Sequence, residues 1–219
     1  MAALTWDVVG KREYETGADH GVLFPYDTQK GVYGNGVAWS GLTGVTQSPS
    51  GADANATYAD NIKYLNLRGT EDFGFTIKAY TYPDEWSSCD GSKELAKGVT
   101  IAQQKRSMFG FCYRTIKGND TEENDHGYIL HLIYGGTASP SERDYQTVND
   151  SPEALELSWE CTTTPVNVAG FKPTALVEVD STKVDATKLA DLEKILYGDD
   201  STESRLPLPD EIKTLMAAS

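Results

Sequence analysis

The chain has few basic residues for its length. Of its 219 residues, 19 are Lys or Arg and 33 are Asp or Glu, so the formal net charge is −14 at pH 7. Proteins that bind nucleic acid tightly neutralise phosphates with clustered Lys and Arg. No strongly basic cluster stands out in the sequence, so tight binding of DNA or RNA is not expected. The acidic balance fits either simple solubility or a surface that lies close to another polyanion without adhering to it.

Cysteines and long apolar runs are also scarce. Cys89, Cys112 and Cys161 are odd in number and form no C-x-x-C pair, which disfavours a disulfide framework and a zinc site. Cys112 and Cys161 lie among strand-like residues and are expected to be buried as small apolar side chains. No stretch approaches the ~20 consecutive apolar residues of a spanning helix. The N-terminal residues lack the pattern of a secretory signal, so no membrane association is expected.

Catalytic and metal-binding motifs are missing as well. G-x-S-x-G, H-E-x-x-H and P-loop patterns do not occur. His131 lies within the apolar run YILHLIY and is expected to be a hydrogen-bonded core or interface residue, while His126 follows an acidic turn and is expected to face solvent. That turn, residues 119–125, lacks the spacing of a calcium loop. The sequence therefore predicts no enzyme, no cofactor and no metal.

The residues that are present predict a mainly β fold. Apolar and polar residues alternate with period two along FTIKA and LELSWEC, which is typical of strands with one buried and one wet face. Residues 128–134 are apolar on both faces and are expected to form a central strand. Seven or eight such strands, separated by Gly, Pro, Asn and Asp, predict an antiparallel β-sandwich or partial barrel.

Few helices are predicted: a single helical turn at residues 83–89 and two helices near the C-terminus. Asp185 is placed as an N-cap, Leu189, Leu192, Ile195 and Leu196 form one apolar stripe, and Gly198 follows as a C-cap. We expect one β domain over residues 1–198 with this flanking helix at 185–197. Residues 199–219 are expected to be a linker and a short helix that docks either on its own subunit or on a neighbour, with an apolar face of Ile212, Leu215 and Met216.

One segment reads as a long exposed hairpin. Residues 36–67 consist of two strand-like arms around a middle of small and polar residues. Exposed strands leave backbone groups unpaired along their edges, which favours pairing with another chain. The predicted tip comprises Ser48, Pro49, Ser50, Gly51, Ala52, Asp53, Ala54, Asn55 and Ala56. The predicted arms include Trp39, Leu42, Tyr58, Ile62 and Tyr64.

Several segments together resemble the major tail protein, or tail tube protein, of long-tailed bacteriophages. They are AWSGLTGVTQSPSGADANATYADNIKYLNL, FTIKAYTYPDEW with CDGS, FGFCYRTIKGND with DHGYILHLIYG, SPSERDYQTVNDSPEALELSWECTTTPV, and DSTKVDATKLADLEKILYG with LPLPDEIKTLM. The resemblance covers nearly the whole chain. It rests on the order and extent of these pieces and not on a signature residue.

The resemblance implies a structural virion protein that forms stacked hexameric rings around a channel for the genome. Its implied partners are other copies of itself and the tail-tip initiator, terminator and tape-measure proteins, with assembly in the bacterial host cytoplasm and DNA passing without specific binding. The hairpin and the C-terminal arm would contact neighbouring subunits. An acidic lumen would repel phosphates. Candidate carboxylates for its lining, which could equally face outward, are Asp60, Glu156, Glu160, Glu178 and Asp180.

Two alternatives remain open from the sequence. A free-standing β-sandwich could bind carbohydrate or a cell surface through Trp39, Trp86, Tyr58 and Tyr64, although packing in the core or an interface is the more common role for such aromatics. The same fold could instead serve as the inner tube of a contractile tail.

Overall fold

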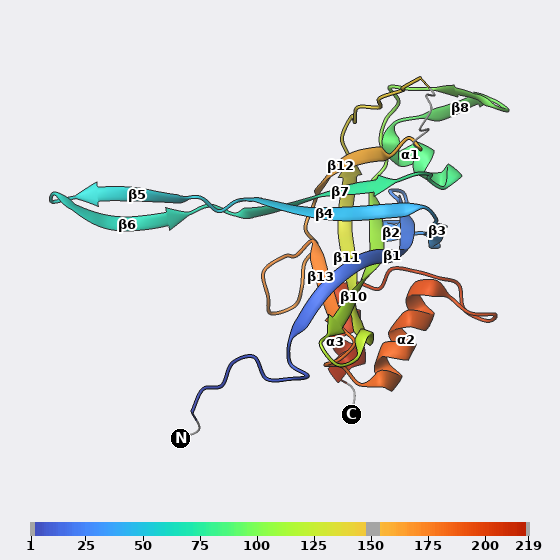
Figure 1. Ribbon diagram of the computed structural model, residues 1–219. Coiled ribbons are helices and arrows are strands. Elements are labelled where there is room, and N and C mark those ends of the chain that lie inside the picture. The colour runs from blue at the N-terminus through green and yellow to red at the C-terminus, as the bar shows by residue number, and fades with distance from the viewer. Residues whose placement is uncertain (1–2, 148–153, 218–219) are drawn as a thin grey trace.

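The structure is a computed structural model that describes residues 3–147 and 154–217. Its body is an antiparallel sheet that bends over on itself, with helices against one side and a long two-stranded arm projecting from it (Figure 1). This confirms the predicted mainly β fold with a flanking helix. The strands before the first helices are β1 (Glu13–Asp27), β2 (Val32–Tyr33), β3 (Val37–Trp39), β4 (Leu42–Gly51), β5 (Ala54–Ala59), β6 (Ile62–Arg68) and β7 (Glu71–Ala79). The remaining elements are η1 (Asp84–Trp86), α1 (Ser87–Asp90), β8 (Lys93–Ala96), β9 (Val99–Ile101), β10 (Phe109–Asn119), β11 (Glu123–Ala138), β12 (Leu157–Thr163), β13 (Leu176–Asp180), α2 (Ala186–Tyr197) and α3 (Pro209–Ala217).

The main sheet has the strand order β2-β1-β10-β11-β12-β7-β4, with β3 added to β1 and β13 added to β11. β10 and β11 form its centre. Period-two alternation sends Phe111 and Tyr113 of β10 to one face of the sheet and Cys112 to the other. Leu132 of β11, paired with Cys112, lies on that second face as well. Both faces of this pair are therefore buried, as the apolar run at 128–134 predicted.

The first face closes around aromatic side chains. Trp86 is fully buried, and its ring centroid lies 4.8 Å from that of Trp39, 4.9 Å from that of Phe109 and 5.5 Å from that of Trp159. The indole Nε1 of Trp39 donates to the carbonyl oxygen of Thr81 at 2.8 Å. β4, β7 and β12 cover this cluster from the other side, which makes the sandwich.

The second face packs against α2 and α3. Asp185 caps α2 as expected, because its Oδ1 accepts from the backbone N–H of Thr187 at 2.9 Å and of Lys188 at 3.3 Å. Leu189, Leu192 and Leu196 are buried against the sheet.

The C-terminal helix corrects one expectation. Ile212 is buried, and Leu215 and Met216 pack against the same cluster as α2. The hydroxyl of Tyr134 donates to the carbonyl oxygen of Pro207 at 2.8 Å, and Lys188 Nζ donates to that of Met216 at 2.8 Å. The apolar face predicted for an inter-subunit docking arm is therefore used within its own subunit, because β11 and α2 leave an apolar surface that α3 covers.

The cysteines behave as small apolar side chains. Cys89, Cys112 and Cys161 are buried and unpaired with one another. Burial raises the pKa of Cys89 to about 11 and that of Cys112 to about 12, so both remain protonated thiols at neutral pH.

Trp86→Ala tests the aromatic cluster. Removing this fully buried ring is expected to lower the free energy of unfolding by about 3–5 kcal/mol, because the cavity is walled by other rigid rings. Urea unfolding of the isolated subunit measures the loss. Tyr58→Ala, at a side chain that is 70% exposed, is the control and should change stability by less than about 0.5 kcal/mol. Equal losses in both variants would contradict this assignment of the core.

Candidate assembly surfaces

The projecting arm consists of two hairpins in series. Its base is the β4–β7 pair, in which Val45 faces Ile77 and Gly51 faces Glu71. Beyond it, β5 and β6 form a separate two-stranded ribbon that stands away from the body (Figure 1). The arm therefore extends to Ala79 and does not end at Leu67. The sequence predicted a hairpin in this region and a separate strand along FTIKA, but not that this strand pairs with β4.

The tip of the arm lies elsewhere than predicted. Ser48 and Ser50 belong to β4 and face Gly74 and Asp72 of β7. The turn is formed by Asp60 and Asn61, whose φ angles are +51° and +62°. Two successive positive φ angles define the turn that matches the twist of a two-residue hairpin, and Asp and Asn tolerate them well. The predicted tip at 48–56 is thus wrong, and the Asp-Asn pair between alternating strands was the overlooked signal.

The β5–β6 ribbon has one apolar and one polar face. Leu67 lies opposite Asn55, Leu65 opposite Thr57, and Ile62 opposite Ala59. Because residues 55, 57 and 59 share one face of β5, these three apolar side chains gather on that face. Leu65 is 47% exposed, Leu67 56% and Ile62 62%.

The opposite face of the ribbon is polar. It carries Tyr58 opposite Lys63, and Arg68 opposite Ala54. An isolated two-stranded hairpin is only marginally stable in water, and nothing in the described residues covers its apolar face. The apolar face of the ribbon, defined by Ile62, Leu65 and Leu67, is therefore suited to contact with another surface.

The aromatic residues considered for sugar stacking separate into two groups. Trp39 is 3% exposed and Trp86 is fully buried, so neither presents a face to a ligand. Trp39 also belongs to β3 and to the core, not to a hairpin arm. Leu42 opens β4 and packs against the same core. Only Tyr58 and Tyr64, 70% and 63% exposed on the ribbon, remain accessible.

A polar cluster lies where the arm leaves the body. His131 is 4% exposed; its Nε2 lies 2.8 Å from Thr115 Oγ1 and its Nδ1 lies 3.0 Å from Glu178 Oε1. Its ring stacks on Tyr113, with 4.5 Å between centroids. Gln47 of β4 donates to the hydroxyl of Tyr113 at 2.9 Å. His131 is therefore the hydrogen-bonded core residue that the sequence predicted, and it links β11 to the root of the arm.

The five predicted lumen carboxylates do not share one surface. Asp60 is at the tip of the ribbon, and Glu178 is bound to His131. Asp180 lies 2.9 Å from the buried Lys117 Nζ and 3.1 Å from Lys183 Nζ. Burial alone would raise the pKa of Asp180, but hydrogen bonds from Thr182, Lys117 and Lys183 hold it well below its usual range. Its role here is to neutralise Lys117.

The other two carboxylates do share a face. Glu160 faces Thr76 across the β12–β7 pair, and Thr76 faces Thr46 across the β7–β4 pair. Glu156 accepts a hydrogen bond of 2.6 Å from Thr43. The outward positions of these three strands are polar or small, and they are Gly44, Thr46, Ser48, Gly74, Thr76, Lys78, Ser158, Glu160 and Thr162. This face, here called the polar sheet face, is wet and nearly free of large side chains.

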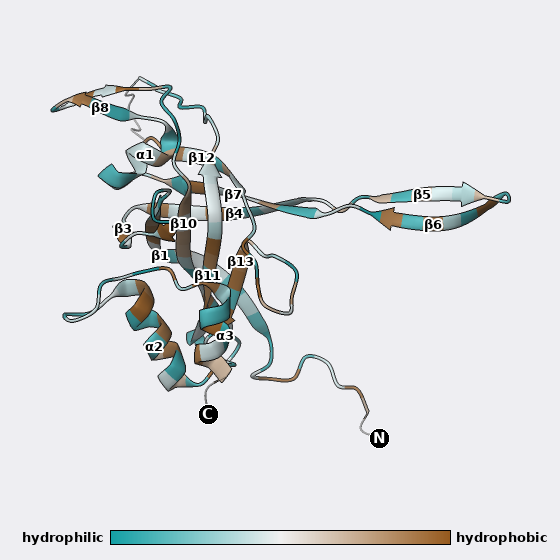
Figure 2. Cartoon of the chain, turned by 180° about the vertical axis from the view of Figure 1, so that it is seen from behind, coloured by the Kyte–Doolittle hydropathy of each residue, from teal (hydrophilic) through white to brown (hydrophobic). Residues whose placement is uncertain are grey.

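Apolar residues are distributed differently in the body and in the arm (Figure 2). The apolar segments of β10, β11 and α2 lie within the body, whereas apolar residues also occur on β6 far from it.

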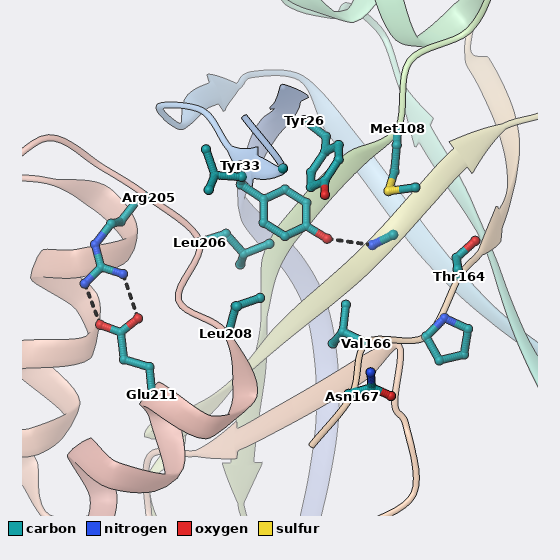
Figure 3. Close-up of a pocket in the computed structure, with 14 residues that line it drawn as sticks. Tyr26, Tyr33, Met108, Thr164, Val166, Asn167, Arg205, Leu206, Leu208 and Glu211 are labelled. Carbon is teal, nitrogen blue, oxygen red and sulfur yellow. Dashed lines mark hydrogen bonds and ion pairs between the residues drawn. The ribbon is translucent and has the colours of Figure 1, made fainter. Parts of the chain in front are cut away.

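One cleft of about 590 Å³ lies between β2, the loop after β12 and the segment before α3 (Figure 3). Its walls include Val32, Val166, Leu206 and Leu208. The hydroxyl of Tyr33 accepts from the backbone N–H of Gly135 at 2.9 Å, and Arg205 pairs with Glu211 at the rim. The two charged side chains that line the cleft, Arg205 and Glu211, are thus paired with each other. The cleft has largely apolar walls. Its lining residues include no nucleophilic side chain hydrogen-bonded to a base.

Residues 3–147 and 154–217 offer neither a metal-binding group of side chains nor a membrane-spanning helix. They contain no group of three or more His, Cys, Asp or Glu side chains placed to hold a metal ion. None of the described helices is both long and apolar enough to cross a membrane.

The chain shows little similarity to known proteins in sequence or in structure. No protein-family model matches the chain, and no curated protein matches it significantly. Among solved structures, the chain is similar to one titled as the sheath/tube terminator of the extracellular contractile injection system PVC, in its extended state. The TM-score is 0.32 and the identity 11%, over 81% of this chain and 99% of that one. A TM-score this low does not establish a shared fold, so nothing about this chain is inferred from it.

His131→Gln tests the cluster at the root of the arm. Burial lowers the pKa of His131, with Glu178 opposing the shift, so the folded state favours the neutral ring. The corresponding stability is present above the pKa of an unfolded histidine and is lost as pH falls through the lower folded value. Between pH 7.5 and 5, the free energy of unfolding should fall less steeply in His131→Gln than in the parent. Identical slopes in urea titrations would rule out this role.

Proposed function

We propose that the chain is a structural subunit of a phage tail tube, which polymerises as stacked hexameric rings around a channel for the genome. The observation that carries the proposal is the β5–β6 ribbon, whose apolar face has no cover among the described residues of its own subunit. The near full-length resemblance to tail tube proteins supports it. The proposed role is assembly, without catalysis.

The ribbon provides a contact between subunits in this proposal. Ile62, Leu65 and Leu67 would lie on the body of a neighbouring copy, which would bury apolar surface that now faces water. Because the ribbon and the surface it covers are different parts of the chain, the contact is head-to-tail. Head-to-tail contacts close into rings when the rotation between copies permits. The ribbon therefore suits a cyclic assembly.

The polar sheet face is our candidate for the channel lining. Sheets that continue from subunit to subunit lose their exposed edges, and β4 is a terminal strand of the main sheet with such an edge. Glu156 and Glu160 would then face the lumen and repel phosphates, although Lys78 on the same face offsets part of their charge, and the small side chains at its other positions leave the wall smooth. Asp60, Glu178 and Asp180 are not part of this lining. The same arrangement would serve in a non-contractile tail or as the inner tube of a contractile one.

The triple variant Ile62→Ser, Leu65→Ser, Leu67→Ser tests the ribbon contact. We expect the parent to form rings or tubes in electron micrographs and the variant to remain a folded monomer in sedimentation velocity, because the buried apolar surface of the contact is removed. The matched control is Tyr58→Ser, Lys63→Ser, Arg68→Ser, which alters the polar face of the same strands. If the apolar-face variant formed normal tubes, the proposed role of the ribbon would be wrong.

Removing the ribbon altogether gives an independent measurement. The backbone N–H of Ala52 donates to the carbonyl oxygen of Thr70 at 3.1 Å, so residues 53–69 can be replaced by an Asn-Gly turn without stretching the base of the arm. The free energy of unfolding of the shortened chain should lie within about 0.5 kcal/mol of that of the parent, because the ribbon contributes few contacts to the core. It should also fail to polymerise. A large loss of stability would show that the ribbon serves its own fold.

A further inference from the structure

The charge of the molecule is distributed unevenly between its two ends. Residues 92–107 carry four cations, Lys93, Lys97, Lys105 and Arg106, and one anion, Glu94, a local net charge of +3. The whole chain carries −14, so the remaining residues carry −17. We call the segment 92–107, which includes the β8–β9 ribbon, the basic end.

The cations of the basic end have no ion-pair partner within the described residues. The ion pairs among residues 3–147 and 154–217 leave out all four of its cations. Leu95 is 68% exposed, Val99 51% and Ile101 36% on the same ribbon. An exposed two-stranded ribbon that carries both unpaired cations and apolar side chains is suited to a contact surface.

A complementary surface lies at the other end of β10. Residues 119–126 comprise the turn between β10 and β11 with the adjoining strand ends, and they contain Asp120, Glu122, Glu123 and Asp125 and no Lys or Arg. Asp120 accepts from the backbone N–H of Gly10 at 2.9 Å, and Glu122 lies 2.6 Å from His126. Glu123 and Asp125 are exposed and take part in no ion pair within the described ranges. We call residues 119–126 the acidic end.

The acidic end also has apolar neighbours. The segment tethered to Asp120 through Gly10 includes Leu4, 79% exposed, Trp6, 76% exposed, and Val9, 70% exposed. Arg12 of the same segment lies 3.8 Å from Asp120 and offsets part of the negative charge there, as Glu94 offsets part of the positive charge at the basic end. Each end of the molecule therefore combines a net charge, negative at residues 119–126 and positive at residues 92–107, with uncovered apolar side chains.

The two ends cannot meet within one subunit. Arg106 lies three residues before β10 begins, and Asn119 is the last residue of β10. β10 has 11 residues, which at the usual rise per strand residue span roughly 35 Å. The β8–β9 ribbon and the helices α2 and α3 also lie at opposite extremities of the body in both views (Figures 1 and 2). The charges of the two ends are thus available only to another molecule.

We propose that the basic end of one copy docks on the acidic end of the next, so that copies stack along the direction of β10. The occupant of the β8–β9 surface is then a second copy of this chain, selected by charge complementarity. Opposite potentials steer such docking and fix its polarity, because two basic or two acidic ends repel each other. This inference uses the proposed function only for the ring, since the end-to-end contact would be the one that joins rings.

Charge reversal at either end tests the contact. The basic-end variant is Lys93→Glu, Lys97→Glu, Lys105→Glu, and the acidic-end variant is Glu123→Lys, Asp125→Lys. Each alone should shift the assembled material from tubes to single rings in electron micrographs and sedimentation velocity at low salt. The matched control for the basic-end variant, Lys30→Glu, Lys172→Glu, Lys194→Glu, makes the same change in net charge at positions outside both ends and should still form tubes.

Mixing the two end variants separates a specific contact from a general charge effect. In a mixture, every reversed basic end can meet a reversed acidic end with restored complementarity, so tubes should return. Raising the salt concentration should weaken stacking of the parent, since these exposed charges are screened. Tubes from each end variant alone, or no recovery on mixing, would overturn the inference.

The outcomes also distinguish this inference from the proposed function. Rings of the parent that never stack would refute the end-to-end contact and leave the ring. Filaments of single copies without rings, abolished by the end variants, would support the contact and refute the tube. A parent that stays monomeric at low salt and high concentration would refute both.

Discussion

The structure depends on one constraint, that β10 and β11 are apolar on both faces. Phe111 and Tyr113 point to one side of the pair, while Cys112 and Leu132 point to the other. Each side must be covered, because large exposed apolar surfaces are unfavourable in water. The aromatic cluster under β4, β7 and β12 covers one side, and α2 with α3 covers the other. The arrangement of all other elements follows from these two layers.

The arm extends beyond these two layers. β4 and β7 are held in the sandwich by Val45 and Ile77 near one end, and they continue past the core as a free pair. Beyond Gly51 no second layer exists, so the apolar face of β5–β6 keeps its exposure. A fold that buries Trp86 completely yet leaves Leu67 in water is consistent with selection for contact with another molecule, because the ribbon contributes little to its own core.

Charged groups have three roles in the protein: within a close ion pair, on one face of the sheet and across the whole subunit. Close pairs such as Lys117 with Asp180 neutralise a buried cation within the fold. Glu156 and Glu160 sit on a smooth polar sheet face, where their charge is available to repel other anions. The separation of the basic end from the acidic end gives the whole subunit a direction along β10. A subunit with both a lateral ribbon and an axial polarity has the two kinds of contact that a helical or stacked assembly needs.

The sequence by itself determined the strand pattern, the central position of residues 128–134, the burial of Cys112 and Cys161, His131 as a hydrogen-bonded core residue and the capped helix at 185–197. These features depend on local alternation and local hydrogen bonds, which neighbouring residues specify. Only the tertiary structure decided where the hairpin turns, that Trp39 is in the core, that α3 covers its own subunit and that Asp180 is committed to Lys117. Alternation shows which side chains share a face, but what lies over that face depends on strand register and on segments distant in sequence, such as β7 over β10 and α3 over β11.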